Sequence, residues 1–355
     1  MKIFQRIFLP IMLMVGVALT ALPILAEVTD GNPLGLQRAM EVQERNTDAL
    51  LTIPGVVGTA VGLRGDGAPV VLVLTEHGLV RGLPQSLEGV PVQVKVTGKI
   101  YSRHHTPGHD GGPPGGGGGG GSGEEVDPTA RFDRPVPIGV STGHPDITAG
   151  TIGTRVTEGG NVYALSNNHV YADENFANIG DDVIQPGSYD DGKLPADYLG
   201  ALSDYKPIVF STSAENDIDA AIAITTTDLL GNATPSDGYG TPKTDTISSA
   251  SLNMKVKKYG RTTGQTKGQV YAINATVDVG YTSGVARFIN QIIITPGSFS
   301  AGGDSGSLIV VDGKGRNKAD DRRPVGLLFA GSNVVTIANP IDAVLGYFGV
   351  AIDGN

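Results

Sequence analysis

The stretch GGDSGSLIV occupies residues 302–310 and places an acid and a serine among glycines, directly before an apolar run. Gly, Asp and Ser are common turn residues, so a plain turn before a strand is one interpretation. The other is that Ser305 is a nucleophile on a tight loop, whose glycines let backbone N–H groups converge on one point. The rest of the chain has to decide between the two.

Composition narrows the classes of protein that fit. The chain has 355 residues, enough for two or three domains, and its 52 glycines indicate many turns. A net charge of −10 without any block of Lys or Arg argues against nucleic acid or an anionic membrane surface as the partner. Because the chain has no cysteine, disulfides and thiol chemistry are excluded.

The first 26 residues have the pattern of a secretory signal peptide. Lys2 and Arg6 precede a long apolar run that ends in small residues near Ala26. The run is also long enough for an uncleaved membrane anchor, and that alternative stays open. We therefore expect a secreted or periplasmic protein, without stable membrane association once the signal is removed.

Residues 28–100 predict a small α+β domain that contains no cluster of catalytic residue types. His77 is its single histidine, and we interpret it as a surface residue. In the last predicted strand, valine recurs at every second position, which indicates one buried face. The predicted elements are a helix at 34–52 and strands at 56–63, 69–74 and 90–96.

Residues 101–130 predict a disordered linker because a run of glycine cannot offset the entropy lost on ordering. His104, His105 and His109 lie in this tract and could in principle bind a metal. They lack carboxylate or thiol support nearby, so we expect neither a metal nor a cofactor.

From residue 131 to 355 the sequence changes to short β-type runs separated by Gly, Pro, Asp and Asn. Such spacing is typical of antiparallel barrels or a sandwich, and about 225 residues suit a mainly β domain of two barrels. Helical periodicity occurs only near the end, at 338–348.

A nucleophilic serine needs a base to accept its proton and an acid to orient that base. Only His144 and His169 follow the linker, and His144 precedes a proline in a turn-like context. His169 closes YALSNNHVYA (163–172), a strand followed by a polar corner. The acid should have apolar neighbours, which favours Asp219 in NDIDAAIAI (216–224), with Asp217 as the alternative.

His169, Asp219 and Ser305 follow one another in the order that the chymotrypsin-like serine protease family uses. The chain resembles that family in SNNHV, DAAI and GDSG, over roughly residues 131–355. RPVPIG (134–139), GRTTGQTKGQV (260–270), and LLFAGS with ANPI (327–341) are also similar to a bacterial and plant subgroup typified by the narrow-leaf proteins.

The resemblance implies a role for each matching residue. Ser305 would attack the scissile carbonyl, His169 would transfer its proton, and Asp219 would hold the imidazole in place. The backbone N–H groups of Gly303 and Ser305 would form the oxyanion hole.

The resemblance also implies where a substrate would bind. The strand segment Phe329, Ala330 and Gly331 would pair with an extended substrate backbone. Phe299 stands near the position that sets the floor of the primary pocket. Because no carboxylate stands near it in the sequence, we expect cleavage after small or medium apolar residues.

Two departures from the family's pattern affect these expectations. Most members pair a freed terminal amine with the acid before the serine, but here PVPIGV is internal. Asp304 must therefore be satisfied locally. The family's cysteine beside the histidine is Val170 in this chain.

The sequence thus predicts an exported serine endopeptidase that acts on a protein or peptide, and leaves its oligomeric state open. The alternative is a catalytically silent module that binds peptides. A regulatory or structural role of the domain at 28–100 is compatible with either interpretation.

Overall fold

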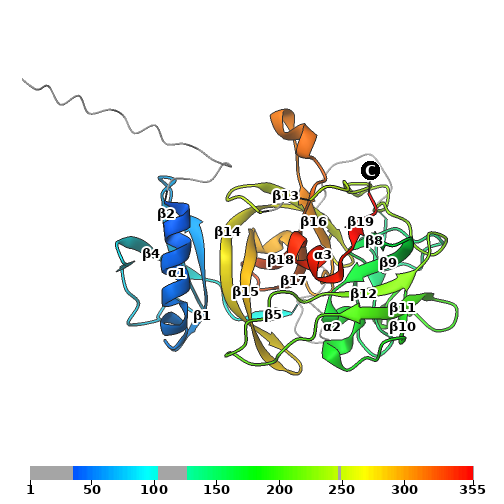
Figure 1. The fold of residues 1–355 in the computed structure, drawn as a ribbon, viewed down its shortest axis with the longest axis horizontal. Helices are drawn as coiled ribbons and strands as arrows, with labels where there is room; N and C mark the ends of the chain where they lie inside the picture. Colours follow the sequence, from blue (N-terminus) through cyan, green and yellow to red (C-terminus); the bar gives the residue numbers. More distant parts are fainter. Residues whose placement is uncertain (1–34, 103–125, 247–248, 355) are drawn as a thin grey trace, which may run out of the picture.

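A computed structural model of the chain describes residues 35–102, 126–246 and 249–354. The described chain is mainly β, as expected, with a helix-covered N-terminal unit beside two packed β bodies (Figure 1). The apolar segment at 1–26 and the three linker histidines lie outside the described residues. Within those residues, no helix combines the length and apolar character needed to cross a bilayer.

The N-terminal unit consists of helix α1 (Leu36–Leu51) packed on a sheet of four strands. Helix spacing brings Leu36, Ala39 and Val42 onto one buried face, against Val61 and Val71 of the sheet. The predicted helix and strands are confirmed within one or two residues. The strands, in spatial order, are β1 (Val56–Leu63), β2 (Pro69–Thr75), β4 (Val90–Val96) and β3 (Ser86–Leu87).

Strand β4 is buried less than its valine pattern suggests. Val90 is buried, but Val94 and Val96 are each 43% exposed. Because β4 lies near the outer end of the sheet, α1 does not cover these two side chains. His77, in contrast, is exposed as expected.

The N-terminal sheet continues into the C-terminal part of the chain. Strand β1 pairs antiparallel with β14 (Gly264–Tyr281), with Gly58 opposite Val277 and Gly62 opposite Ala272. A Cβ atom at Gly58 would lie 2.6 Å from the carbonyl oxygen of Thr276, so the close approach requires glycine there. The two parts thus share one eleven-stranded sheet.

The first β body contains a six-stranded antiparallel sheet (Figure 1) and a separate two-stranded sheet. Its core is apolar and includes Ile138, Val140 and Leu199. The six strands are, in spatial order, β10 (Asp182–Ile184), β11 (Tyr198–Tyr205), β12 (Ala221–Thr225), β9 (Asn161–Ser166), β8 (Thr154–Glu158) and β19 (Ala351–Ile352); the short pair is β6 (Ser141–Thr142) and β7 (Gly150–Thr151).

The second β body contains the long hairpin of β14 and β15 and ends in helix α3 (Ile341–Phe348), which confirms the helix predicted near the end of the chain. Strand β17 lies centrally, with β16 along one edge and β18 along the other. The remaining strands are β13 (Lys255–Gly260), β15 (Gly284–Thr295), β16 (Leu308–Val311), β17 (Pro324–Gly331) and β18 (Thr336–Pro340).

Both ends of the predicted linker belong to the fold. Residues 101–102 lie in strand β5 (Ile100–Ser102), which pairs with β14 and with β17. At the other end, the carbonyl oxygen of Pro128 accepts a hydrogen bond from the backbone of Ser141 at 2.9 Å. The segment for which the linker prediction stays untested is therefore 103–125.

Candidate active site

His169 lies on the one-turn helix α2 (Asn168–Tyr171), directly after β9. The sequence predicts a polar corner there, and the structure closes that corner into a single helical turn. Asn167 donates from its side-chain amide to the carbonyl oxygen of Asp219 at 2.7 Å. This bond ties the corner to the segment that carries the predicted acid.

Asp219 and His169 form a buried pair. The Nδ1 atom of His169 is 2.5 Å from Oδ2 of Asp219, and the two side chains are 1% and 0% exposed. Asp219 lies two residues before β12, which pairs with β9, so sheet register brings Asp219 and His169 together. Asp217 points elsewhere: its carboxylate is half exposed and lies 3.5 Å from the ammonium of Lys206.

Ser305 lies on the loop before β16, close to the segment that carries His169. The backbone N–H of Thr151 donates to the carbonyl oxygen of Ser305 at 2.7 Å. The neighbouring Gly150 packs closely between Val170 and Ser305. A Cβ atom at Gly150 would lie 2.5 Å from the Val170 side chain and 3.2 Å from the Ser305 carbonyl oxygen. The Ser305 hydroxyl donates to the carbonyl oxygen of Phe329 at 3.3 Å.

Two peptide planes around Ser305 are fixed by hydrogen bonds to their carbonyl oxygens. The carbonyl of Gly302 accepts from Thr262 Oγ1 at 2.6 Å, and that of Asp304 accepts from Ser307 Oγ at 2.6 Å. In a trans peptide the N–H points opposite to the C=O. The N–H groups of Gly303 and Ser305 therefore point away from these partners.

Gly303 itself has a left-handed backbone with φ of 93°. A Cβ atom there would lie 2.4 Å from Thr262 Oγ1. Both the backbone conformation and the contact require glycine, so the orientation of the Gly302–Gly303 peptide depends on residue type.

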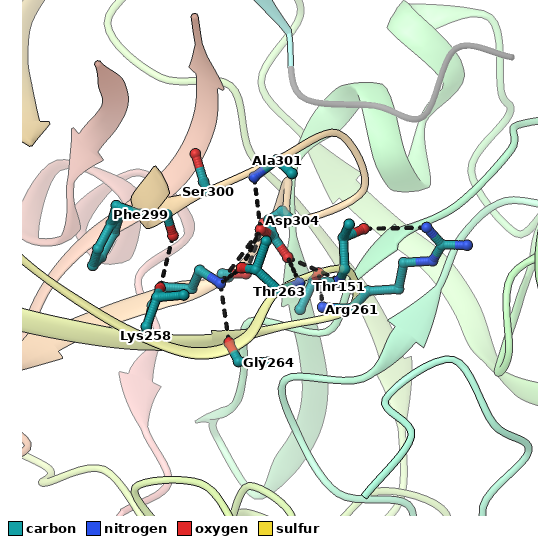
Figure 2. Close-up of polar contacts among 12 residues, drawn as sticks. Thr151, Lys258, Arg261, Thr263, Gly264, Phe299, Ser300, Ala301 and Asp304 are labelled. Carbon is teal, nitrogen blue, oxygen red and sulfur yellow. Dashed lines mark hydrogen bonds and ion pairs between the residues drawn. The ribbon is translucent and has the colours of Figure 1, made fainter. Parts of the chain in front are cut away.

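Asp304 is fully buried and is satisfied locally, as expected. Figure 2 shows its carboxylate enclosed by backbone and side-chain donors and facing the ammonium of Lys258, which comes from β13. The Lys258 Nζ atom lies 3.3 Å from Asp304 Oδ2, and both side chains are 0% exposed. Further donors are the Thr262 N–H at 2.9 Å, the Ala301 N–H at 2.9 Å, the Thr263 N–H at 3.2 Å and the Thr263 hydroxyl at 2.7 Å.

Charge and burial act against each other in this pair. Burial lowers the pKa of Lys258, although Asp304 opposes that effect. Burial alone would raise the pKa of Asp304, but Lys258 and the hydrogen bonds outweigh it and hold that pKa below its usual value. Arg261, also drawn in Figure 2, is engaged elsewhere, in an ion pair with Asp190.

We expect Lys258→Met to destabilise the protein by about 3–5 kcal/mol, because it leaves Asp304 buried without a counter-charge. The measurement is urea unfolding at neutral pH. Lys255→Met, on the same strand but exposed, is the matched control and should change the free energy of unfolding by less than about 0.5 kcal/mol. Equal unfolding midpoints for the two variants would show that the ion pair does not support the loop.

The strand predicted to bind substrate is already paired. Ala330 lies opposite Ser102 and Gly331 opposite Tyr101, so β5 runs antiparallel along the end of β17. Strand β16 pairs with the earlier part of β17, up to Leu308 opposite Leu327. Strand β5 pairs with β17 beyond that point. The chain's own segment thus occupies the backbone positions that the sequence assigns to a substrate.

The two phenylalanines of the predicted substrate site are core residues in this structure. Phe329 is 0% exposed and packs against Phe288, with the two rings tilted and their centroids 4.8 Å apart. Phe299 is also 0% exposed, and its ring lies 2.8 Å from where a Cβ atom at Gly268 would be. The structure therefore does not bring Phe299 to a surface that a substrate could touch.

Three features of the site are missing from the sequence interpretation. Lys258 could have been suspected, because consecutive lysines in a strand must face opposite sides and one of them turns inward. Strand β5 and Tyr281, which donates its hydroxyl to Asp219 Oδ2 at 2.8 Å, carry no sequence signal. Among the described residues, no group of three or more His, Cys, Asp or Glu side chains is arranged to hold a metal ion.

Comparison with known proteins gives a family match over part of the chain and a set of similar structures. The family model described as the Nal1 C-terminal domain matches residues 243–337. No curated protein matches the chain.

Among the similar solved structures are several bacterial proteases. Thermobifida fusca Protease A is 18% identical, with 62% of this chain and 100% of that chain covered and a TM-score of 0.43. The Nocardiopsis protease is 16% identical, with 61% and 99% covered and a TM-score of 0.42. The MamO protease domain from Magnetospirillum magneticum is 12% identical, with 60% and 97% covered and a TM-score of 0.31.

Proposed function

We propose that this protein is an exported serine endopeptidase that hydrolyses peptide bonds through an acyl-enzyme. The observation that carries the proposal is the buried His169–Asp219 pair, 2.5 Å apart, beside the loop that holds Ser305. A carboxylate beside Nδ1 holds the imidazole in the tautomer whose Nε2 atom can act as a base. Export is supported by the signal-like segment at 1–26.

The chemistry follows from these groups. Ser305 Oγ attacks the carbonyl carbon of the scissile bond while its proton passes to His169 Nε2, and the amine leaves with that proton. Water then attacks the ester, gives a proton to His169, and releases the acid as Ser305 regains its hydroxyl. The N–H groups of Gly303 and Ser305, oriented by Thr262 and Ser307, would stabilise the oxyanion in both steps.

A fluorophosphonate probe tests this function directly, because it reacts with an activated serine whatever the substrate. We expect labelling of the full chain at Ser305, and no labelling of Ser305→Ala. A mixed peptide library, with cleavage sites mapped by mass spectrometry, then reports the preferred residue before the cut bond. Dominant cleavage after Lys, Arg or Glu would contradict the expected preference for small or medium apolar residues.

The position of strand β5 implies that the proposed enzyme is autoinhibited, because β5 lies where substrate would bind. A substrate backbone that pairs with Ala330 and Gly331 must first displace Tyr101 and Ser102 from the same edge. Both cannot occupy that edge, so β5 would compete with every extended substrate.

We therefore expect Tyr101→Pro to lower KM for an extended peptide about tenfold. Proline removes the backbone N–H and weakens β5 pairing, while each lost hydrogen bond is worth about 0.5–1.5 kcal/mol. Steady-state kinetics on one peptide measure the effect, and Tyr101→Val, which keeps the N–H, is the control.

Two other results for Tyr101→Pro would have different structural meanings. β5 also pairs with Val279 and Gly280 of β14, so a fall in kcat would report damage to the hairpin rather than relief of competition. An unchanged KM in a folded Tyr101→Pro variant would show that β5 does not block substrate.

The second candidate function is a silent module that binds peptide without cleaving it. The occupied edge of β17 favours it, because it shows that this edge binds an extended strand. Failure of the fluorophosphonate to label Ser305 in both the native chain and Tyr101→Pro would select this candidate.

A further inference from the structure

The tip of the β14–β15 hairpin reaches across to the buried pair. Tyr281, the last residue of β14, donates its hydroxyl to Asp219 Oδ2 at 2.8 Å. This is the same carboxylate oxygen that faces His169 Nδ1 at 2.5 Å. The two contacts converge on one atom, so the tyrosine hydroxyl helps to fix where that oxygen lies.

The ring of Tyr281 is itself held on several sides. It meets the His169 ring edge to face with centroids 5.9 Å apart, and packs against Phe210 at 5.6 Å and Phe288 at 6.1 Å. Burial, followed by the charge of Asp219, raises the pKa of Tyr281 well above its ordinary value. The hydroxyl therefore stays protonated and can only act as a donor toward the carboxylate.

Glu174 anchors the tip of the hairpin to the segment that carries His169. Its carboxylate accepts hydrogen bonds from the backbone N–H groups of Thr282 at 3.1 Å and Ser283 at 2.7 Å. Glu174 is 7% exposed and has a left-handed backbone with φ of 53°. A conformation this unfavourable for a residue with a side chain persists only where the surroundings hold it.

We propose that Tyr281 is a positioning residue of the active site, and that Glu174 is the anchor that keeps it there. The hairpin tip then completes the site by fixing the carboxylate of Asp219, which in turn orients His169. This inference rests on the proposed function only for its kinetic test, since the hydrogen bonds exist whether or not the protein is a peptidase.

The first experiment is Tyr281→Phe, which removes the hydroxyl and keeps the ring. We expect kcat to fall about tenfold with KM changed less than twofold, the size typical of losing one hydrogen bond to a charged group. Tyr271→Phe is the matched control, because it removes a hydroxyl from the same strand far from Asp219 and should leave kcat unchanged. Urea unfolding of both variants separates loss of positioning from loss of fold.

A double-mutant cycle tests whether Tyr281 acts through Asp219. In an Asp219→Asn background, Tyr281→Phe should change kcat less than twofold, because the carboxylate that it positions is gone. Glu174→Gln keeps one acceptor oxygen and should lower kcat less than Tyr281→Phe does. When the two substitutions are combined, kcat should be close to that of Tyr281→Phe alone. A tenfold effect in both backgrounds would assign Tyr281 a structural role and overturn the inference.

Proton NMR provides a readout that needs no turnover. The resonance of the proton between His169 Nδ1 and Asp219 should move in Tyr281→Phe and stay in place in Tyr271→Phe. If the native chain hydrolyses nothing, the proposed function fails and this resonance alone decides the inference. An unmoved resonance would overturn it, even in an active enzyme.

Discussion

Ser305→Ala is expected to lower kcat for peptide hydrolysis by about 10^6-fold and to leave the fold intact. Only the hydroxyl is lost, so the Thr151 hydrogen bond to the Ser305 carbonyl and the ion pair of Lys258 with Asp304 remain. The loop and its N–H donors should therefore keep their arrangement. What disappears is the nucleophile, so no acyl-enzyme can form.

The measurement is single-substrate kinetics at saturating peptide, with circular dichroism as the check on folding. Ser298→Ala, an exposed serine on the same connection, is the control and should retain full activity. His169→Ala should be as inactive as Ser305→Ala, whereas His144→Ala should not be, because the His144 ring faces Asp181 at 3.5 Å. If Ser305→Ala kept most of its kcat, another group would have to be the nucleophile.

Asp219→Asn is expected to lower kcat by about 10^4-fold. The amide keeps the size of the carboxylate, but it can present an N–H to His169 Nδ1 and so favour the tautomer that cannot accept the proton of Ser305. It also removes the charge that would stabilise the imidazolium in a site where both side chains are buried.

Asp217→Asn is the matched control for that variant. Its carboxylate is half exposed and lies beside Lys206, so a neutral amide there should cost less than about 1 kcal/mol of stability and little activity. The two variants differ by two positions on one segment. A severe loss in Asp217→Asn with a mild one in Asp219→Asn would move the acid to position 217.

Much of the local structure could be predicted from the sequence. The helix at 36–51 and the strands at 56–63 and 90–96 follow from apolar periodicity and from the breakers that bound them. The mainly β class follows in the same way, from short apolar runs separated by turn residues. These signals are local, and each depends only on residues a few positions apart.

The candidate site could be predicted only as a list of residues. Motif order and apolar context nominate Asp219 over Asp217, and the structure brings Asp219, not Asp217, against His169. The same reasoning placed Phe299 at a pocket, but its ring is buried in the core of the second β body. A motif names residue types; it does not say which way a side chain points.

What only the tertiary structure decided is which distant segments meet. Lys258 reaches Asp304 because β13 pairs with β16 and the loop before β16 folds back over it. Tyr281 reaches Asp219 because the long β14–β15 hairpin extends from the second β body to the first. Strand β5 covers the end of β17 because the N-terminal sheet, which leads into β5, is joined to β14. Strand register and the closure of sheets set such contacts, and neither leaves a trace in local periodicity. The sequence by itself therefore determined the elements and nominated the serine of the loop at 302–310, while strand pairing and packing determined that Lys258 faces Asp304, that β5 lies along the end of β17 and that Tyr281 bonds to Asp219.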